Sequence, residues 1–219
     1  MARFAEVTGG RLDAISNKSR LFEEALLKTR FEITKLKNIT KVIKTGTTPH
    51  NSLNPFADIG IPFLRNSNIQ NTILVFDDLK YINCELKNQL TYSYKNEVII
   101  CIAGTVGDSA INHSDKPLAI NQNVSSLSLK ENVNISYLNE FLNSPLNKKL
   151  VKRVCSIATI LYLNNTNLLN LLIPLPPLEK QNEIVKHIAA IREQAFDMRE
   201  QAKAILQQTK SEIEEMIIG

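Results

Sequence analysis

The stretch Ile173–Pro174–Leu175–Pro176–Pro177–Leu178–Glu179–Lys180–Gln181 separates two parts of the chain that have different sequence patterns. Prolines fix φ and remove backbone donors, so the proline-rich half predicts an extended or polyproline-like strut. Glu179 and Gln181 then suit a first helical turn, where acidic groups face the positive end of the helix dipole. From there to Gly219 the sequence has no proline and no internal glycine. This predicts a continuous helix of roughly 60 Å.

Within the predicted helix, the apolar residues follow one another in alternating steps of four and three. Such spacing over several heptads is typical of a coiled-coil seam, and the alanines in it would let two backbones approach closely. The alternative is an amphipathic helix that packs on its own domain. The length favours an antiparallel partner, from a second copy or from another part of a longer polypeptide. The predicted seam comprises Ile184, Ile188, Ile191, Ala195, Met198, Ala202 and Ile205.

Before the proline-rich stretch, short apolar runs alternate with turns that contain glycine and asparagine. Val98–Ile102 predicts a buried strand that pairs with Ser109–Ile111, and Val124–Leu129 predicts another strand. Helices are predicted at residues 16–29, 136–143 and 145–154. We therefore expect an α+β fold. A mixed or mainly β domain with a few helices, one of them a short N-terminal helix, spans residues 1–177. A long C-terminal coiled-coil helix follows at 178–219.

The composition is that of a globular protein. Of the 219 residues, 43% are hydrophobic, which is ample for a core. No apolar run approaches the roughly 18 residues that a membrane span needs, and no signal segment opens the chain, so we expect a cytoplasmic protein without membrane insertion. Cys84, Cys101 and Cys155 are odd in number and widely spaced, which argues against a disulfide framework or a zinc cluster.

No catalytic motif stands out in the sequence. A phosphate-binding Gly-Lys-Ser/Thr loop is absent, and His50, His113 and His187 are far apart. We expect a non-catalytic protein with no metal site and no bound cofactor.

The charge is unevenly distributed along the chain. The net charge is +4, but the residues from Glu179 onward hold six Lys/Arg and eight Asp/Glu, which leaves +6 for the preceding part. A basic domain is compatible with nucleic acid, although an ordinary solvated surface has the same charge.

Polar side chains gather in the expected loops, and they are of the types that bind DNA. Asn and Gln can read adenine and Arg can read guanine, whereas Lys, Ser and Thr can hold phosphate. For each residue the alternative is a turn-capping or solvated role. The candidate base readers are Arg65, Asn66, Asn68, Gln70, Asn121, Gln122 and Asn123. The candidate phosphate ligands are Lys44, Thr45, Thr47, Lys95, Thr105, Lys148, Lys149, Lys152 and Arg153.

Several of these segments together resemble the DNA-specificity subunits of type I restriction–modification enzymes. The matching segments are Lys44–Pro49, Ile61–Arg65 with Asn68–Ile69, Ala103–Gly107, Ala119–Gln122, Tyr137–Leu138, Leu142–Pro145, Asn167–Leu168 and Ile173–Gln181, and residues 9–15 resemble an opening found in some members. The proline-rich motif before a coiled-coil helix is the most specific of them. The chain departs from the pattern at Ser156–Ile160, where relatives often have a more polar turn that contains glycine.

The resemblance implies a target-recognition domain followed by a spacer helix, in half-subunit form. Such a domain would read one half of a split double-stranded target. Methyltransferase subunits, which use S-adenosylmethionine, would dock on the helix, and the restriction subunit with ATP and Mg²⁺ would join through them. A second spacer helix would come from a homodimer, or the chain is one unit of a longer subunit. Two alternatives remain: a coiled-coil adaptor that binds no DNA, and the recognition domain of a fused restriction–methylation enzyme.

Overall fold

The computed structural model describes residues 28–155 and 161–219, apart from the side chain of Arg153. The expected N-terminal helix at 16–29 lies almost wholly outside these residues, as do the opening at 9–15 and the divergent turn at Ser156–Ile160. The chain divides into two compact units, one that reaches Gln181 and one formed by Asn182–Gly219.

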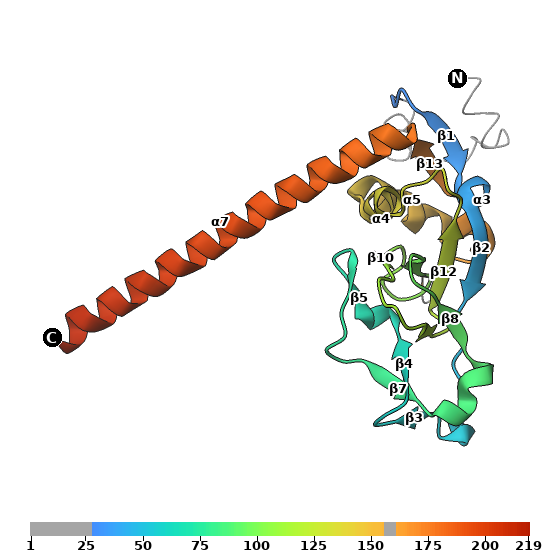
Figure 1. Ribbon diagram of the computed structural model, residues 1–219, viewed down its shortest axis with the longest axis horizontal. Helices are drawn as coiled ribbons and strands as arrows, with labels where there is room; N and C mark the ends of the chain where they lie inside the picture. Colours follow the sequence, from blue (N-terminus) through green and yellow to red (C-terminus); the bar gives the residue numbers. More distant parts are fainter. Residues whose placement is uncertain (1–27, 156–160) are drawn as a thin grey trace. The chain divides into compact units, whose positions relative to one another are not determined.

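A four-stranded antiparallel sheet forms the centre of the first unit (Figure 1). Its order is β10 (Ser109–Ile111), β9 (Val98–Cys101), β12 (Val124–Leu129) and β2 (Thr40–Thr45). Every residue of β9 is buried, as the continuous apolar run predicts for a strand covered on both faces. The predicted pairing of β9 with β10 is confirmed, with Ile99 opposite Ala110.

A five-stranded sheet adjoins the first one. Its order is β3 (Phe56–Ala57), β7 (Lys80–Ile82), β4 (Ile61–Leu64), β11 (Leu118–Ile120) and β8 (Thr91–Ser93). β4 and β11 run parallel, and the other neighbours are antiparallel. A two-stranded hairpin, β5 (Ile69–Gln70) with β6 (Ile73–Leu74), follows β4. The short helices η1 (Asn51–Leu53), η2 (Asn66–Asn68) and η3 (Cys84–Gln89) fill the connections.

Helices cover one face of the four-stranded sheet, and α4, α5 and α6 begin at residues that cap helices well. They are α3 (Leu36–Ile39), α4 (Ile135–Asn143), α5 (Pro145–Val154) and α6 (Asn165–Leu169). The side chains of Asn134, Ser144 and Asn164 accept hydrogen bonds from the first turns of α4, α5 and α6, and Pro145 takes the first position of α5. Leu138 and Val151 pack with Ile100 in the larger hydrophobic core.

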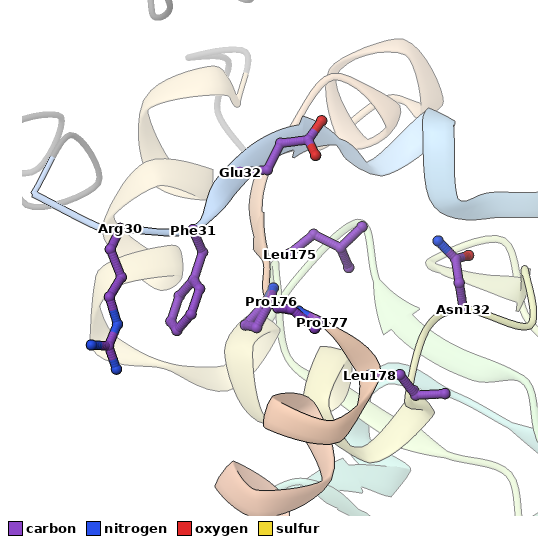
Figure 2. Close-up of a pocket in the computed structure, with 8 residues that line it drawn as sticks. All are labelled: Arg30, Phe31, Glu32, Asn132, Leu175, Pro176, Pro177 and Leu178. Carbon is purple, nitrogen blue, oxygen red and sulfur yellow. The ribbon is translucent and has the colours of Figure 1, made fainter.

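The proline-rich stretch is extended, as predicted, and its first half forms a strand (Figure 2). Leu172–Leu175 forms β13, which pairs antiparallel with β1 (Glu32–Lys35), with Pro174 opposite Ile33. A proline is tolerated here because this two-stranded pair has free edges. The Tyr137 hydroxyl donates to the Pro174 carbonyl at 2.7 Å, and burial raises the pKa of this phenol to about 12. The stretch is therefore part of the domain.

The long helix is confirmed as α7 (Leu178–Ile218), and its first turn belongs to the first unit. Gln181 is fully buried. Its side-chain oxygen accepts from the Asn134 amide at 2.7 Å, and its amide nitrogen donates to the carbonyls of Pro176 (2.8 Å) and Asn132 (3.3 Å). A buried amide with all these partners holds the first helical turn against the loop before α4.

Lys44 and Glu97 form a partly buried charged pair. Lys44 contacts both carboxylate oxygens of Glu97 at 2.8 and 2.9 Å, and Ser126 donates to the same carboxylate at 2.6 Å. Burial acts to raise the pKa of Glu97, but the hydrogen bonds from Lys44, Ser126 and the Tyr94 amide outweigh it and lower this pKa below its ordinary value. The charged form of Glu97 therefore stabilises the fold.

We expect Glu97→Gln to lower the free energy of unfolding at neutral pH by about 1–3 kcal/mol, because Lys44 loses its charged partner. A carboxyl with a depressed folded pKa stabilises the fold above its unfolded pKa and loses that effect as the pH falls through the folded pKa. The difference between the two proteins should therefore shrink below about pH 4. Urea unfolding at a series of pH values measures it, and a pH-independent difference would contradict this role.

Candidate nucleic-acid interface

Four strands of the two sheets end at the same place. β4 and β11 run parallel and end side by side, with Leu64 opposite Ile120. β2 and β9 end beside the start of β12, which lies between them. The turn 121–123 joins β11 to β12, so the carboxyl ends of all four strands meet around it. We call this region the loop surface; it comprises residues 46–48, 65–66, 102–105 and 121–123.

Main-chain hydrogen bonds hold the loop surface together. The Asn121 amide donates to the Leu64 carbonyl at 3.0 Å, and the Ile102 amide donates to the Asn123 carbonyl at 2.8 Å. A Cβ on Gly46 would lie 2.1 Å from the Asn121 carbonyl oxygen, so only glycine fits there. This close approach explains why a glycine lies between Thr45 and Thr47.

Thr45 and Thr47 use their hydroxyls inside the fold. Thr45 lies 2.9 Å from the Ser125 hydroxyl. Thr47 donates to the Gln89 carbonyl at 2.8 Å and accepts from the Thr91 amide at 3.1 Å. These contacts hold the loop after β2, and they leave both hydroxyls engaged with the domain.

Arg65 is the residue before η2, and Asn68 shapes the loop around it. The Asn68 side chain accepts from the Arg65 amide at 3.0 Å and donates to the Val75 carbonyl at 3.1 Å, and only 2% of the residue is exposed. Asn68 therefore fixes the loop between β4 and β6. Gln70, on β5, is exposed, and its amide donates to the Ser67 carbonyl at 2.9 Å.

The guanidinium of Arg65 faces a carboxylate. One of its terminal nitrogens lies 2.7 Å from an Asp78 carboxylate oxygen and 3.1 Å from the Asp78 carbonyl oxygen. Lys80 is 3.9 Å from the other oxygen of the same carboxylate. The Arg65 Nε atom is buried without a protein partner within the part of the chain that the structure describes.

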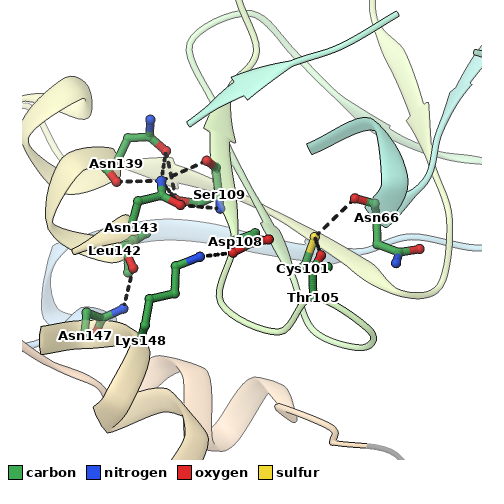
Figure 3. Close-up of polar contacts among 10 residues, drawn as sticks. All are labelled: Asn66, Cys101, Thr105, Asp108, Ser109, Asn139, Leu142, Asn143, Asn147 and Lys148. Carbon is green, nitrogen blue, oxygen red and sulfur yellow. Dashed lines mark hydrogen bonds and ion pairs between the residues drawn. The ribbon is translucent and has the colours of Figure 1, made fainter. Parts of the chain in front are cut away.

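The turn Gly104–Gly107 brings Asn66, Thr105 and Lys148 to one region (Figure 3). Gly104 has φ of 78°, and a Cβ there would lie 2.6 Å from the Asn66 side-chain nitrogen. Thr105 donates to the Cys101 sulfur at 3.4 Å, and the Cys101 thiol contacts the Asn66 carbonyl at 3.8 Å. Burial raises the pKa of this thiol to about 11, so it stays protonated at neutral pH.

Lys148, on α5, forms an ion pair with Asp108 at the end of the same turn. The predicted basic patch on α5 therefore adjoins the loop surface through its first lysine. Lys149 and Lys152 are exposed. The side chain of Arg153 is not among those that the structure describes.

The remaining candidates differ in exposure. Asn121 is buried, and its side-chain oxygen accepts from the Asn123 amide at 3.2 Å. Gln122 is exposed and contacts the Thr48 hydroxyl. Lys44 is held by Glu97, and the exposed Lys95 pairs with Asp115 at 2.5 Å.

Some residues that shape the interface were not identified from the sequence. Asn143 donates to the Ser109 carbonyl at 2.9 Å and to its hydroxyl at 2.8 Å, and Asn139 accepts from that hydroxyl at 2.8 Å. These bonds fix β10 against α4 (Figure 3). Asp78 and Asp108 were also missed, because their cation partners are distant in the sequence. Only Asn143 had a signal, since it lies in the Leu142–Pro145 motif.

The loop surface offers hydrogen-bonding groups. Within residues 28–155 and 161–219, no group of three His, Cys, Asp or Glu side chains is placed to hold a metal ion. In the same ranges, no helix has the length and apolar character to span a membrane. The surface presents side-chain amides, the Thr105 hydroxyl and the Arg65 guanidinium, which reach solvent from loops held by main-chain hydrogen bonds. Groups of these types can bind nucleic acid.

These features are typical of a DNA-recognition domain that is followed by a long helix. A comparison with protein families leads to the same class of protein. Residues 28–208 match the type I restriction modification DNA specificity domain. The chain belongs to this family.

Solved structures of similar fold come from the same kind of system. A chain of a type I R-M system, solved to describe its assembly and conformational transition, is 22% identical with a TM-score of 0.62; the match covers 93% of this chain and 52% of that one. The HsdS subunit from Thermoanaerobacter tengcongensis is 19% identical with a TM-score of 0.57, with coverage of 88% and 47%. The S subunit from M. genitalium is 15% identical with a TM-score of 0.51; the match covers 76% of this chain and 41% of that one. The chain thus spans about half the length of these proteins.

Asn68 and Gln70 provide a matched pair for separating loop shape from surface chemistry. We expect Asn68→Ala to lower the free energy of unfolding by about 1–3 kcal/mol, because it leaves the Arg65 amide and the Val75 carbonyl without partners. Gln70→Ala, at an exposed site two residues away, should change it by less than about 0.5 kcal/mol. Urea unfolding measures both, and equal effects would contradict the structural role of Asn68.

Proposed function

We propose that this chain reads one half of a bipartite duplex-DNA target as the specificity part of a type I restriction–modification assembly, and that it performs no catalysis. The loop surface carries the proposal. It places exposed amides and a guanidinium, the groups that read base edges, where four strands end. Recognition by such groups requires a fixed frame, which the hydrogen bonds around residues 121–123 supply.

The candidates divide into readers and supports according to their burial. Side chains that reach solvent are proposed to contact bases; these are Arg65, Asn66, Gln70, Thr105, Gln122 and Asn123. Phosphate contacts are assigned to Lys80, beside the loop surface, and to the cations on α5, namely Lys148, Lys149, Lys152 and Arg153. Lys95 lies between β8 and β9, at the opposite end of these strands from the loop surface, so it is not assigned a contact. Five residues shape the frame instead, since their side chains are engaged inside the domain: Lys44, Thr45, Thr47, Asn68 and Asn121.

Asp78 and Asp108 bear on how selective the reader is. Asp78 pairs with Arg65, and Asp108 pairs with Lys148. Each ion pair would have to break before its cation could contact DNA. The cation leaves the carboxylate for a phosphate or a guanine edge only when the contact with DNA has better hydrogen-bond geometry. These two acids therefore weaken binding to any DNA that does not align with the surface.

Arg65→Ala and Lys152→Ala should separate base reading from phosphate contact. We expect Arg65→Ala to weaken binding to the target by roughly 10- to 100-fold and to relax specificity at one position. Lys152→Ala should weaken binding to all duplexes alike. It should also reduce by about one the number of counterions released on binding, which the salt dependence measures. Titration of fluorescent duplexes, with and without the target, at several salt concentrations measures both, and methylome sequencing with the cognate methyltransferase supplies the target.

The contrary result would favour the adaptor alternative. Binding that does not depend on salt, or no duplex binding in complex with a methyltransferase, would favour an adaptor whose globular domain binds protein. Arg65→Lys serves as a control for folding, since it keeps the charge but loses the bidentate geometry.

The second unit is proposed to pair with an antiparallel copy of itself. Seam residues are exposed in the single chain: Ile191 by 50%, Met198 by 67% and Ile205 by 64%. Apolar side chains in a row at coiled-coil spacing call for a second helix. A two-fold dimer would present two loop surfaces to a target of two-fold symmetry, one for each half-site.

Exposed apolar residues outside the seam suggest a further partner. Phe196 and Leu206 are each 63% exposed, and Ile213 is 50% exposed. They lie on a face next to the seam, where a methyltransferase subunit is proposed to dock. That subunit would bring S-adenosylmethionine, and the restriction subunit with ATP and Mg²⁺ would join through it. All of this takes place in the cytoplasm, where the DNA is.

A change in helix length tests the spacer role. Deletion of residues 199–205 removes one heptad and keeps the 4-3 spacing, so the half-sites should move closer by about 10 Å, or about three base pairs. Methylome sequencing of cells that carry the variant and its methyltransferase reports this spacing. Deletion of four residues, which breaks the seam, is the control and should abolish modification. An unchanged spacing in the heptad variant would exclude the spacer role.

A further inference from the structure

A tyrosine that the sequence did not single out lies beside the loop surface. Tyr162 forms an antiparallel bridge with Ala103, and the Leu163 amide donates to the Ile102 carbonyl at 2.8 Å. Residues 102–105 belong to the loop surface, so the segment that carries Tyr162 continues this surface. The two partners of an antiparallel bridge carry their side chains on the same face, so the Tyr162 ring lies on the face of Ala103.

The residues after Tyr162 anchor it to the domain. Leu163 is fully buried in the larger hydrophobic core. The Asn165 side chain donates to the Thr45 hydroxyl at 2.9 Å and accepts from the Ser125 hydroxyl at 3.3 Å. Because Leu163 points into the core from an extended segment, its neighbour Tyr162 points outward, and 43% of this tyrosine is exposed. A fixed backbone therefore holds an aromatic ring out to solvent beside the loop surface.

The ring supplies a kind of contact that the loop surface itself lacks. The residues of the loop surface include no aromatic side chain. Ile102 is its largest apolar residue and is fully buried. The loop surface therefore offers amides, hydroxyls and a guanidinium, which bind the polar edges of bases, whereas Tyr162 adds a broad apolar face next to them.

Duplex DNA has an apolar group that matches this face. The major groove exposes the C5 methyl of thymine in the same base pair as the donor and acceptor of adenine. An amide that reads the adenine therefore brings the thymine methyl close to the protein. Ile102 donates to the Asn123 carbonyl and accepts from the Leu163 amide. The candidate amide Asn123 and the ring of Tyr162 are thus carried by segments that bond the same residue.

We propose that Tyr162 is a specificity-determining contact of the recognition domain, with its ring against the C5 methyl of a thymine whose paired adenine is read by a neighbouring amide. This contact rests on the proposed DNA recognition and adds to it a preference for one A·T pair in the half-site. It needs the ring but not the phenol hydroxyl, and it involves no charge.

Deoxyuridine tests the contact directly, because it keeps the base pair and lacks only the C5 methyl. Methylome sequencing supplies the target, and fluorescent duplexes then carry deoxyuridine at one thymine at a time. We expect one substitution in the half-site to weaken binding of the chain, in complex with its cognate methyltransferase, by about fourfold, which is the effect of one buried methyl group. In Tyr162→Ala the same substitution should have no effect, since the methyl has lost its partner.

Tyr162→Phe and Tyr162→Ala form a matched pair that differs in the ring. Tyr162→Phe keeps the ring, so it should keep both the affinity and the deoxyuridine effect. Tyr162→Ala should weaken binding to the target by roughly tenfold and leave the salt dependence unchanged, since no charge is removed.

Tyr94→Ala is the control for the loss of an exposed tyrosine. Tyr94 is 51% exposed and lies between β8 and β9, at the opposite end of these strands from the loop surface. Its removal should leave both the affinity for the target and the deoxyuridine effect unchanged.

The outcomes separate this contact from DNA recognition itself. Without salt-dependent duplex binding, the proposed function fails and the tyrosine contact fails with it. Target-specific binding that no deoxyuridine weakens, a half-site without thymine, or a deoxyuridine effect that persists in Tyr162→Ala overturns the tyrosine contact alone. Equal losses on target and non-target duplexes in Tyr162→Ala also overturn it, because the ring would then contact the DNA backbone. The deoxyuridine series on the unaltered chain keeps the test decisive if Tyr162→Ala folds poorly.

Discussion

The buried amide of Gln181 is the contact on which the arrangement of this protein depends. A single side chain bonds the Asn134 amide and the carbonyls of Asn132 and Pro176. The first turn of α7 is therefore part of the domain core. The prolines have no N–H to donate but keep their carbonyl acceptors, and the side chains of Tyr137 and Gln181 supply donors to the carbonyls of Pro174 and Pro176. The boundary between domain and helix is a folded element in its own right.

Much of the fold could be predicted from local sequence pattern, and the exceptions have a common cause. The apolar run of β9, the strand at Val124–Leu129 and the uninterrupted helix after Leu178 follow from periodicity and from the absence of breakers. The pairing of β13 with β1 could not be predicted, because its partners are far apart in the sequence. The order of the five-stranded sheet, which includes a strand as short as β3, could not be predicted for the same reason.

The same limit applies to the interface. Sequence pattern identified loops rich in amides and hydroxyls, and the structure brings the loops after β2, β4, β9 and β11 to one place. Residue type did not distinguish Asn68, which is buried and holds its own loop, from Gln70, which is exposed. Nor could it reveal that Arg65 and Lys148 each face a carboxylate. Exposure and pairing are properties of the folded chain, so these distinctions come only with the structure.

The frame of the loop surface depends on main-chain hydrogen bonds and on the close approach of Gly46 to Asn121. Main-chain bonds do not depend on which side chain a residue carries. The exposed positions of the surface, such as Thr105 and Gln122, can therefore be exchanged at little cost in stability. Under the proposed function, a change of target would need substitutions only at these exposed positions, where the cost in stability is small. The architecture separates the evolution of recognition from the evolution of the fold.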